Sequence, residues 1–255
     1  MENKYTFHEK GHRHLLNGKP LTGITTVLNV ISKPFLIPWA VNMAVEYIDK
    51  TLNEEIEKQS NETDLLEWLM ENWKRILKEA KVAHTKKKED AGQKGTDVHA
   101  ICEGIIKEAI EQQGGIIHPI HKSENTDNPQ VLHFLNWAEE NKVKFLASEL
   151  HLYSVEHFLG GIMDFVCEID GNVWIGDIKT GSGIYAEAFF QCAGYQIMLE
   201  EMGLYPNIKG HIILNLKKDG SFNEKRSISN EDNKQAFLSA LSLYRIKAKV
   251  EGNLI

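Results

Sequence analysis

The stretch Gly160–Lys179, which reads GGIMDFVCEIDGNVWIGDIK, decides the fold. Asp170 and Gly171 stand between two runs rich in apolar residues, the strongest short-range signal for a β-hairpin. If these two residues alone close the turn, paired residues have numbers that sum to 341, so Asp164 lies opposite Asp177. A four-residue loop with the same centre keeps this register, whereas a three-residue loop destroys it.

The two aspartates are expected to share one face of the sheet with Lys179, because strand side chains alternate with period two. Carboxylates roughly 5 Å apart across a strand pair repel each other. Their neighbours are mostly apolar, as in a sheet covered on both faces, so burial adds an electrostatic penalty. A divalent cation beside Lys179 would neutralise the acids. An isolated Asp-x-Lys tripeptide is usually a solvated strand end, so the hairpin alone leaves both interpretations open.

The same side chains suit phosphodiester hydrolysis. Asp164 and Asp177 are hard oxygen ligands for Mg²⁺ or Mn²⁺, and the carbonyl of Ile178 is a third candidate ligand. Such an ion acts as a Lewis acid and lowers the pKa of its bound water. We expect Lys179 to orient the attacking water or to stabilise the charge of the transition state.

The remaining pattern predicts an α/β or α+β fold, a small mixed β-sheet flanked by helices, in one domain over residues 1–255. Asn17-Gly18 predicts a hairpin within residues 1–22, and Asp219-Gly220 predicts another. The predicted parts are a helical N-terminal part at 24–113, a catalytic sheet core at 144–228 and a C-terminal helix at 231–250. Helices are expected at 25–31, 39–52, 65–83, 89–112, 131–141 and 186–202, with a loop at 53–64.

Composition limits the class of protein. The chain has 255 residues, of which 42% are hydrophobic and 25% charged, as in an ordinary soluble globule. It has neither a membrane span nor a signal-peptide pattern, so we expect a cytoplasmic protein that is not secreted. Three cysteines without a C-x-x-C spacing predict buried thiols in a reducing compartment. They are Cys102, Cys167 and Cys192.

Basic residues have two interpretations. The net charge of −7 argues against a nonspecific binder of polyanions, but it does not describe how the charge is distributed. Lys86, Lys87 and Lys88 form a solvated helix face or, together with Lys33, contact the phosphates of a nucleic-acid strand. Trp39 would then stack on a base or belong to the core.

Five motifs resemble, in the same order, those of the RecB-like branch of the PD-(D/E)XK nuclease superfamily. The resemblance covers residues 95–195 and implies a restriction-endonuclease-like core. It extends more loosely to Gly23–Leu28 and Ser32–Pro34, which look like the start of phage and prophage members. The five motifs are Gly95-Thr96-Asp97-Val98-His99 with Glu103, Ser148-Glu149-Leu150, Gly160-Gly161-Ile162-Met163-Asp164, Asp177-Ile178-Lys179, and Gln191 with Tyr195.

The resemblance also implies roles for single residues. It makes His99 a further metal ligand, which favours Mn²⁺ over Mg²⁺ because imidazole suits Mn²⁺ better. Glu149 completes the ligand set directly, through water, or by supporting a second ion. Glu103, one helical turn from His99, orients the imidazole. Gln191 and Tyr195 share one helix face. Gln191 is expected to hydrogen-bond a phosphate or the surroundings of the site lysine, and Tyr195 to stack or to bond a backbone oxygen. Some relatives carry a four-cysteine iron–sulfur cluster, which we do not expect here.

The expected function is therefore a metal-dependent DNA exonuclease of phage-type recombination, repair or DNA processing. Its substrate would be single-stranded DNA or DNA with free ends, and its partners phage recombination or replication proteins. A structure-selective or restriction-like endonuclease on the same core is one alternative. A non-catalytic nucleic-acid-binding protein is another.

Overall fold

The computed structural model describes residues 3–59, 61–125 and 127–252, although the side chains of residues 91–96 lie outside the description. The chain divides into two compact units, of which unit 1 comprises Met1–Ile31 and Asp97–Ile255 and unit 2 comprises Ser32–Thr96. Helices and mixed sheets make it a mixed α/β protein, as predicted. The predicted helical part at 24–113 is shared between the units, because its two ends pack with the sheet of unit 1.

A six-stranded mixed sheet forms the centre of unit 1. Its order is β4-β6-β7-β8-β9, and β5 pairs with β6 along the other edge of that strand. The β7–β8 and β4–β6 pairs are parallel and the other pairs are antiparallel. The strands are β4 (Thr22–Gly23), β5 (Lys144–Ser154), β6 (Leu159–Ile169), β7 (Asn172–Lys179), β8 (Ile208–Leu216) and β9 (Phe222–Ser227).

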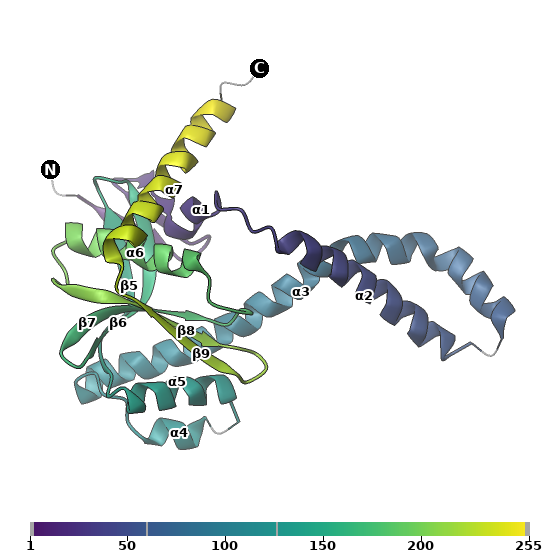
Figure 1. Ribbon diagram of the computed structural model, residues 1–255, viewed down its shortest axis with the longest axis horizontal. Coiled ribbons are helices and arrows are strands. Elements are labelled where there is room, and N and C mark those ends of the chain that lie inside the picture. Colours follow the sequence, from purple (N-terminus) through teal and green to yellow (C-terminus); the bar gives the residue numbers. More distant parts are fainter. Residues whose placement is uncertain (1–2, 60, 126, 253–255) are drawn as a thin grey trace. The chain divides into compact units, whose positions relative to one another are not determined.

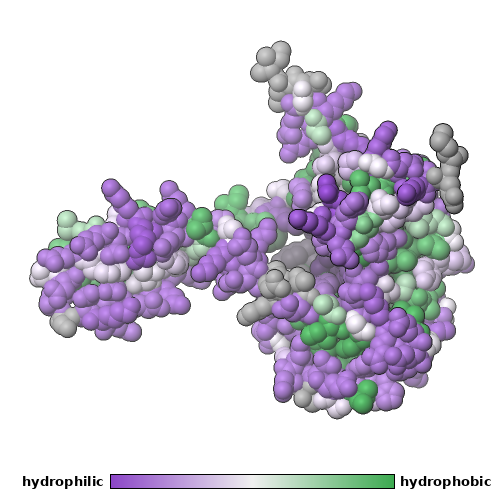
Figure 2. Space-filling view, turned by 180° about the vertical axis from the view of Figure 1, so that it is seen from behind, coloured by the Kyte–Doolittle hydropathy of each residue, from purple (hydrophilic) through white to green (hydrophobic). Residues whose placement is uncertain are grey.

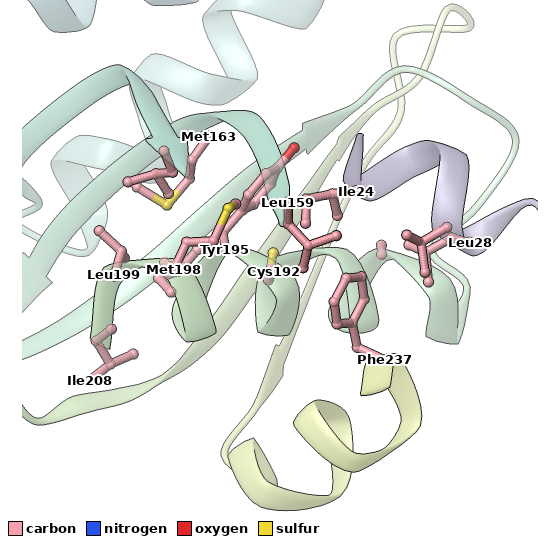
Figure 3. Close-up of a cluster of buried hydrophobic side chains, with 14 of the residues drawn as sticks. Ile24, Leu28, Leu159, Met163, Cys192, Tyr195, Met198, Leu199, Ile208 and Phe237 are labelled. Carbon is pink, nitrogen blue, oxygen red and sulfur yellow. The ribbon is translucent and has the colours of Figure 1, made fainter. Parts of the chain in front are cut away.

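Helices cover both faces of this sheet (Figure 1). One face packs against α1 (Ile24–Leu28), α6 (Ala186–Glu201) and α7 (Asn230–Glu251). Figure 3 shows part of this cluster, in which Tyr195 and Cys192 of α6 lie near Met163 and Leu159 of β6. The other face packs against residues 98–106 of α3 (Glu62–Gln113) and against α5 (Pro129–Glu140). A short helix, α4 (Ile120–Glu124), was not predicted.

The decisive hairpin has the predicted two-residue turn. Asp170 and Gly171 have φ angles of 50° and 72°, as a type I′ turn requires. The five β6–β7 pairs, from Ile169↔Asn172 to Phe165↔Gly176, all sum to 341. Asp164 and Asp177 are the next step in this register, but the ladder ends before them. The two strands therefore separate where the aspartates stand.

The separation has a topological cause. β5 occupies one edge of β6 over its whole length, so β7 and β4 must share the other edge. β7 pairs with β6 only at Phe165–Ile169, and β4 pairs with it only at Leu159–Gly160. The part of the edge between these two pairings, which contains Asp164, has no partner strand. It forms one wall of a cleft.

Two local predictions need correction. The segment predicted as one hairpin at 1–22 contains three strands within residues 5–20, with the predicted Asn17-Gly18 turn between the last two. They are β1 (Tyr5–His8), β2 (Arg13–Leu16) and β3 (Lys19–Pro20). The two helices expected at 65–83 and 89–112 are one continuous helix, α3, of 52 residues. The polar stretch between them includes three lysines, which have good helix propensity, and contains neither proline nor glycine. For the same reason α2 (Leu36–Ile56) extends into the expected loop.

Candidate active site

A cleft of about 720 Å³ in unit 1 brings together most of the predicted site residues. Its walls come from β5, β6, β7, α6, the part of α3 in unit 1 and the N-terminal strands. The predicted residues that line it are His99, Glu149, Asp164, Asp177, Ile178, Lys179, Gln191 and Tyr195. Chain segments more than 90 residues apart thus contribute to one site.

Asp164 joins the two strands where their backbone ladder ends. Its Oδ2 accepts a hydrogen bond of 2.8 Å from the backbone N–H of Ile178. The side chain is 17% exposed, so one side of the carboxylate faces the cleft. Burial raises the pKa of Asp164, and the Lys179 ammonium opposes that rise.

Asp177 and Lys179 form a buried ion pair on β7. The Nζ of Lys179 lies 2.9 Å from Oδ1 and 2.8 Å from Oδ2 of Asp177, but only the contact with Oδ1 has hydrogen-bond geometry. The Asp177 side chain is 1% exposed, and its Oδ2 is buried without a hydrogen bond. Burial raises the pKa of Asp177 to about 6, although Lys179 opposes the rise. Buried carboxylate oxygens without a hydrogen bond are rare, and a bound ion or water is one explanation for them.

Lys179 is held in place by α6. Its Nζ donates to Oε1 of Gln191 at 3.1 Å, and Nε2 of Gln191 donates to the hydroxyl of Tyr195 at 3.1 Å. Burial lowers the pKa of Lys179, but Asp177 and Asp164 outweigh it, so the net shift is upward. The two carboxylates therefore favour the ammonium form of the side chain. Gln191 contacts the site lysine, one of its two predicted roles.

His99 reaches the cleft from α3. Its Nδ1 lies 3.5 Å from Oδ2 of Asp164, and its ring is hydrogen-bonded to the backbone of Ile178. Burial lowers the pKa of His99; the charge of Asp177 opposes this and that of Lys179 adds to it. A neutral imidazole is the form that binds metal ions. Glu103 was expected to orient this ring, but its carboxylate forms an ion pair with Lys107.

Glu149 occupies an unusual backbone conformation in the middle of β5. Its neighbours pair as Ser148↔Phe165 and Leu150↔Met163, so Glu149 stands opposite Asp164. Its φ angle is 48°, in the left-handed region that non-glycine residues avoid, particularly within a strand. Burial raises the pKa of Glu149 to about 7, and the charges of Glu103 and Asp164 add to the shift. No sequence pattern predicts this strained position.

The donor set fits a hard divalent cation. It combines two aspartate carboxylates, one of them with an unbonded oxygen, with a neutral imidazole and a backbone carbonyl. Within the described part of the chain, however, no three His, Cys, Asp or Glu side chains are arranged as a ready-made metal centre. The ammonium of Lys179 already lies against Asp177, which partly neutralises the site.

The N-terminal part of unit 1 supplies cleft residues that the sequence did not point to. His12 before β2, Arg13 in β2 and Thr25 in α1 line the cleft, as does Thr180 after β7. The two glycines of the G-G-I-M-D motif make this packing possible. A Cβ on Gly160 would lie 2.6 Å from the Cβ of His14, and one on Gly161 would lie 2.8 Å from Cε1 of Tyr195. Both contacts are too close for any other residue.

Other predicted residues lie outside the cleft. Lys33 and Lys86–Lys88 belong to unit 2, so their contact with DNA stays a prediction. The side chains of Gly95 and Thr96 lie outside the described residues. The cysteines are buried and free, Cys102 and Cys167 in one core cluster and Cys192 in the other. No helix in the described residues has the length and apolarity to cross a membrane.

Comparison with known proteins adds little to this geometry. No family model matches the chain, and no curated protein matches it. Among the solved structures that match is the crystal structure of SSO0001, with 13% sequence identity. The match covers 57% of this chain and 74% of SSO0001, with a TM-score of 0.28. Similarity at this level supports no conclusion about function.

Proposed function

We propose that this protein is a metal-dependent deoxyribonuclease with a restriction-endonuclease-like core. The observation that carries the proposal is the convergence of His99, Asp164 and Asp177 on a cleft that also holds Lys179. Oδ2 of Asp177 is buried there without a hydrogen bond. The motif resemblance to RecB-like nucleases supports the same reading. The buried thiols agree with a cytoplasmic location.

Mg²⁺ or Mn²⁺ would be held by Asp164, Asp177, His99 and the carbonyl of Ile178, with Glu149 as a further ligand or the support of a second ion. When bound, the ion supplies Lewis acidity and a water of lowered pKa. The protein itself contributes the charge of Lys179. Lys179, held by hydrogen bonds to Gln191 and Asp177, would present its positive charge to the phosphate. This charge stabilises the transition state more than the ground state.

We further propose an exonuclease that uses single-stranded DNA or free ends. The cleft is lined by the catalytic candidates and also by N-terminal residues that include Arg13 and His12. A flexible single strand or a free end enters such a cleft more easily than a continuous duplex does. We also propose that Lys33 and Lys86–Lys88 contact DNA phosphates. Partners in phage recombination or replication belong to the same proposal.

The test uses the full chain with Mn²⁺, Mg²⁺ or EDTA, on four labelled substrates. These are linear single-stranded DNA, linear duplex, closed circular single-stranded DNA and supercoiled plasmid. We expect Mn²⁺-dependent release of nucleotides or short fragments from linear strands, and no cleavage of the circles. Lys179→Ala should abolish cleavage, whereas Lys209→Ala, a change at an exposed lysine of the same sheet, should not.

Other outcomes identify the alternatives. Nicking of closed circles as fast as linear DNA would replace the exonuclease with an endonuclease. Activity in EDTA equal to that in Mn²⁺ would overturn the metal-dependent mechanism. DNA binding without cleavage, under every metal condition, would leave a non-catalytic binding protein.

A further inference from the structure

Unit 2 is an antiparallel pair of helices with almost no interior. It consists of α2 and the part of α3 up to Thr96. Tyr47 of α2 hydrogen-bonds Glu79 of α3, and Trp39 contacts His84, so the two helices lie side by side. Among the described residues of this unit, only Glu55, Ile76 and Ala80 are buried. Helices draw most of their stability from packing an apolar face, so two helices with so small a core lack a partner surface.

The apolar residues that would fill such an interior are exposed in stripes. On α3 they recur at the spacing i, i+4, i+7 and i+11, which forms one narrow seam along a helix. This seam consists of Leu66, Met70, Trp73 and Leu77, which are 58%, 76%, 45% and 36% exposed. On α2, Val41 and Val45 are 56% and 59% exposed. Most of the unit 2 surface that Figure 2 shows is hydrophilic, as expected when apolar residues gather in stripes.

Both stripes lie on one side of the pair. With 3.6 residues per turn, each stripe is rotated by roughly a quarter to a third of a turn from the face that contacts the other helix. In both helices the stripe is offset from the contact face in the same sense, which is the sense in which the helix turns as residue number increases. When two antiparallel helices have the same offset, both stripes point to the same side of the pair. Val41, Val45 and the α3 seam therefore face the same side of the helix pair, and we call the surface on this side the apolar side.

Charge along unit 2 is strongly polarised. Residues 46–71, at the end that contains the loop, carry nine acidic and two basic side chains, a net of −7. Residues 74–94, toward the other end, carry eight basic and three acidic side chains, a net of +5. Two copies that meet antiparallel, near Trp73, bring the acidic end of each level with the basic end of the other. Parallel copies would instead oppose like charges.

We propose that unit 2 is a dimerisation module, in which the apolar sides of two copies of this chain pack antiparallel into a four-helix bundle. This arrangement is compatible with two-fold symmetry, because each copy contributes the same surface to the interface. Heptad-like seams and complementary charges are the features that select partner and orientation in helical assemblies. The inference is independent of the proposed nuclease activity.

The experiment is sedimentation velocity on the full chain, from about 1 to 100 µM and at low and high salt. We expect a dimer that weakens as salt rises. Met70→Glu with Trp73→Glu should raise the dissociation constant at least about 100-fold. Leu243→Glu, at an exposed apolar residue of α7, is the matched control and should not change it. Circular dichroism checks that each variant keeps its helices.

A charge-swap series then tests orientation. Lys86→Glu with Lys87→Glu should weaken the dimer, and so should Glu62→Lys with Glu67→Lys. All four changes in one chain should restore it, because the two ends exchange sign. A monomer at every concentration, or a dimer unaffected by Met70→Glu and Trp73→Glu, would overturn the proposal. Weakening that the four-fold variant does not reverse would overturn the antiparallel arrangement.

Discussion

The backbone N–H of Ile178 donates to Oδ2 of Asp164 at 2.8 Å, just beyond the last backbone pair of the β6–β7 ladder, Phe165↔Gly176. A side chain thus replaces the backbone as the link between the strands. The bond fixes the carboxylate of Asp164 beside the carbonyl and side chains of the Asp177-Ile178-Lys179 segment. Asp164 therefore contributes a hydrogen bond to the fold and a negative charge to the site, and two substitutions can separate these contributions.

Asp164→Asn should keep the bond to Ile178, because an amide oxygen also accepts, but it removes the charge that holds a cation. Asp164→Ala removes both and leaves a buried N–H unpaired, which costs about 1–3 kcal/mol. We expect both variants to bind Mn²⁺ at least about 10-fold more weakly by calorimetry, and only the alanine variant to unfold more easily in urea. Equal Mn²⁺ affinity in Asp164→Asn and the parent would remove Asp164 from the ligand set.

Lys179→Met should destabilise the protein, because it leaves Asp177 buried beside Asp164 without its cation. Breaking a buried ion pair costs about 3–5 kcal/mol, and the lower end applies because the lysine side chain is still 32% exposed. Adding Asp177→Asn should recover most of this loss. The measurement is a double-mutant cycle by chemical denaturation. A cycle without coupling would mean that the ion pair contributes nothing to the fold.

Glu149→Gly should make the protein more stable while impairing metal binding and any cleavage. Glycine adopts a φ of 48° without strain, and relief of such strain is worth about 1–3 kcal/mol. The variant also removes a carboxylate that stands close to Asp164 and Glu103. Glu149→Ala is the control, since it removes the carboxylate but keeps the strain. A glycine variant no more stable than the alanine variant, in thermal unfolding, would contradict the strain.

His211 should make stability fall as the medium becomes acidic. It is buried on β8, with Nε2 2.8 Å from Oε1 of Gln196, and burial lowers its pKa to about 4. The unfolded chain binds a proton near pH 6.5, which the folded chain accepts only near pH 4. The contribution of His211 to the free energy of unfolding is therefore fully present above pH 6.5. It falls by about 3 kcal/mol as the pH decreases from 6.5 to about 4.

His211→Gln should reduce that slope without removing it, because burial also lowers the pKa of His14 to about 4. Denaturation in urea at a series of pH values measures the slope for the parent and the variant. The cleft carboxylates, whose pKa values are raised, titrate in the same way in the parent and in the variant. They therefore do not affect the difference between the two stability curves. Parallel stability curves for the two proteins would show that His211 does not titrate in this window.

Sequence alone determined what depends on neighbouring residues. The Asp170-Gly171 pair requires positive φ angles, and these specify a two-residue turn and the 341 register. Strand alternation then put Asp177 and Lys179 on one face, and helical periodicity put Gln191 one turn from Tyr195. These relationships follow from local backbone geometry, so they can be derived from a few residues.

Tertiary structure decided what depends on distant segments meeting. The arrival of His99 beside Asp164 requires α3 to pack on the sheet, and the sequence suggested it only through the family resemblance. The strained φ of Glu149, the cleft wall with Arg13, and the sharing of one β6 edge by β4 and β7 had no sequence signal. The continuous helix α3 was missed because a charged stretch suits a loop and a solvated helix equally. Burial, pairing and strain arise from the sum of many long-range contacts, which a local pattern does not contain.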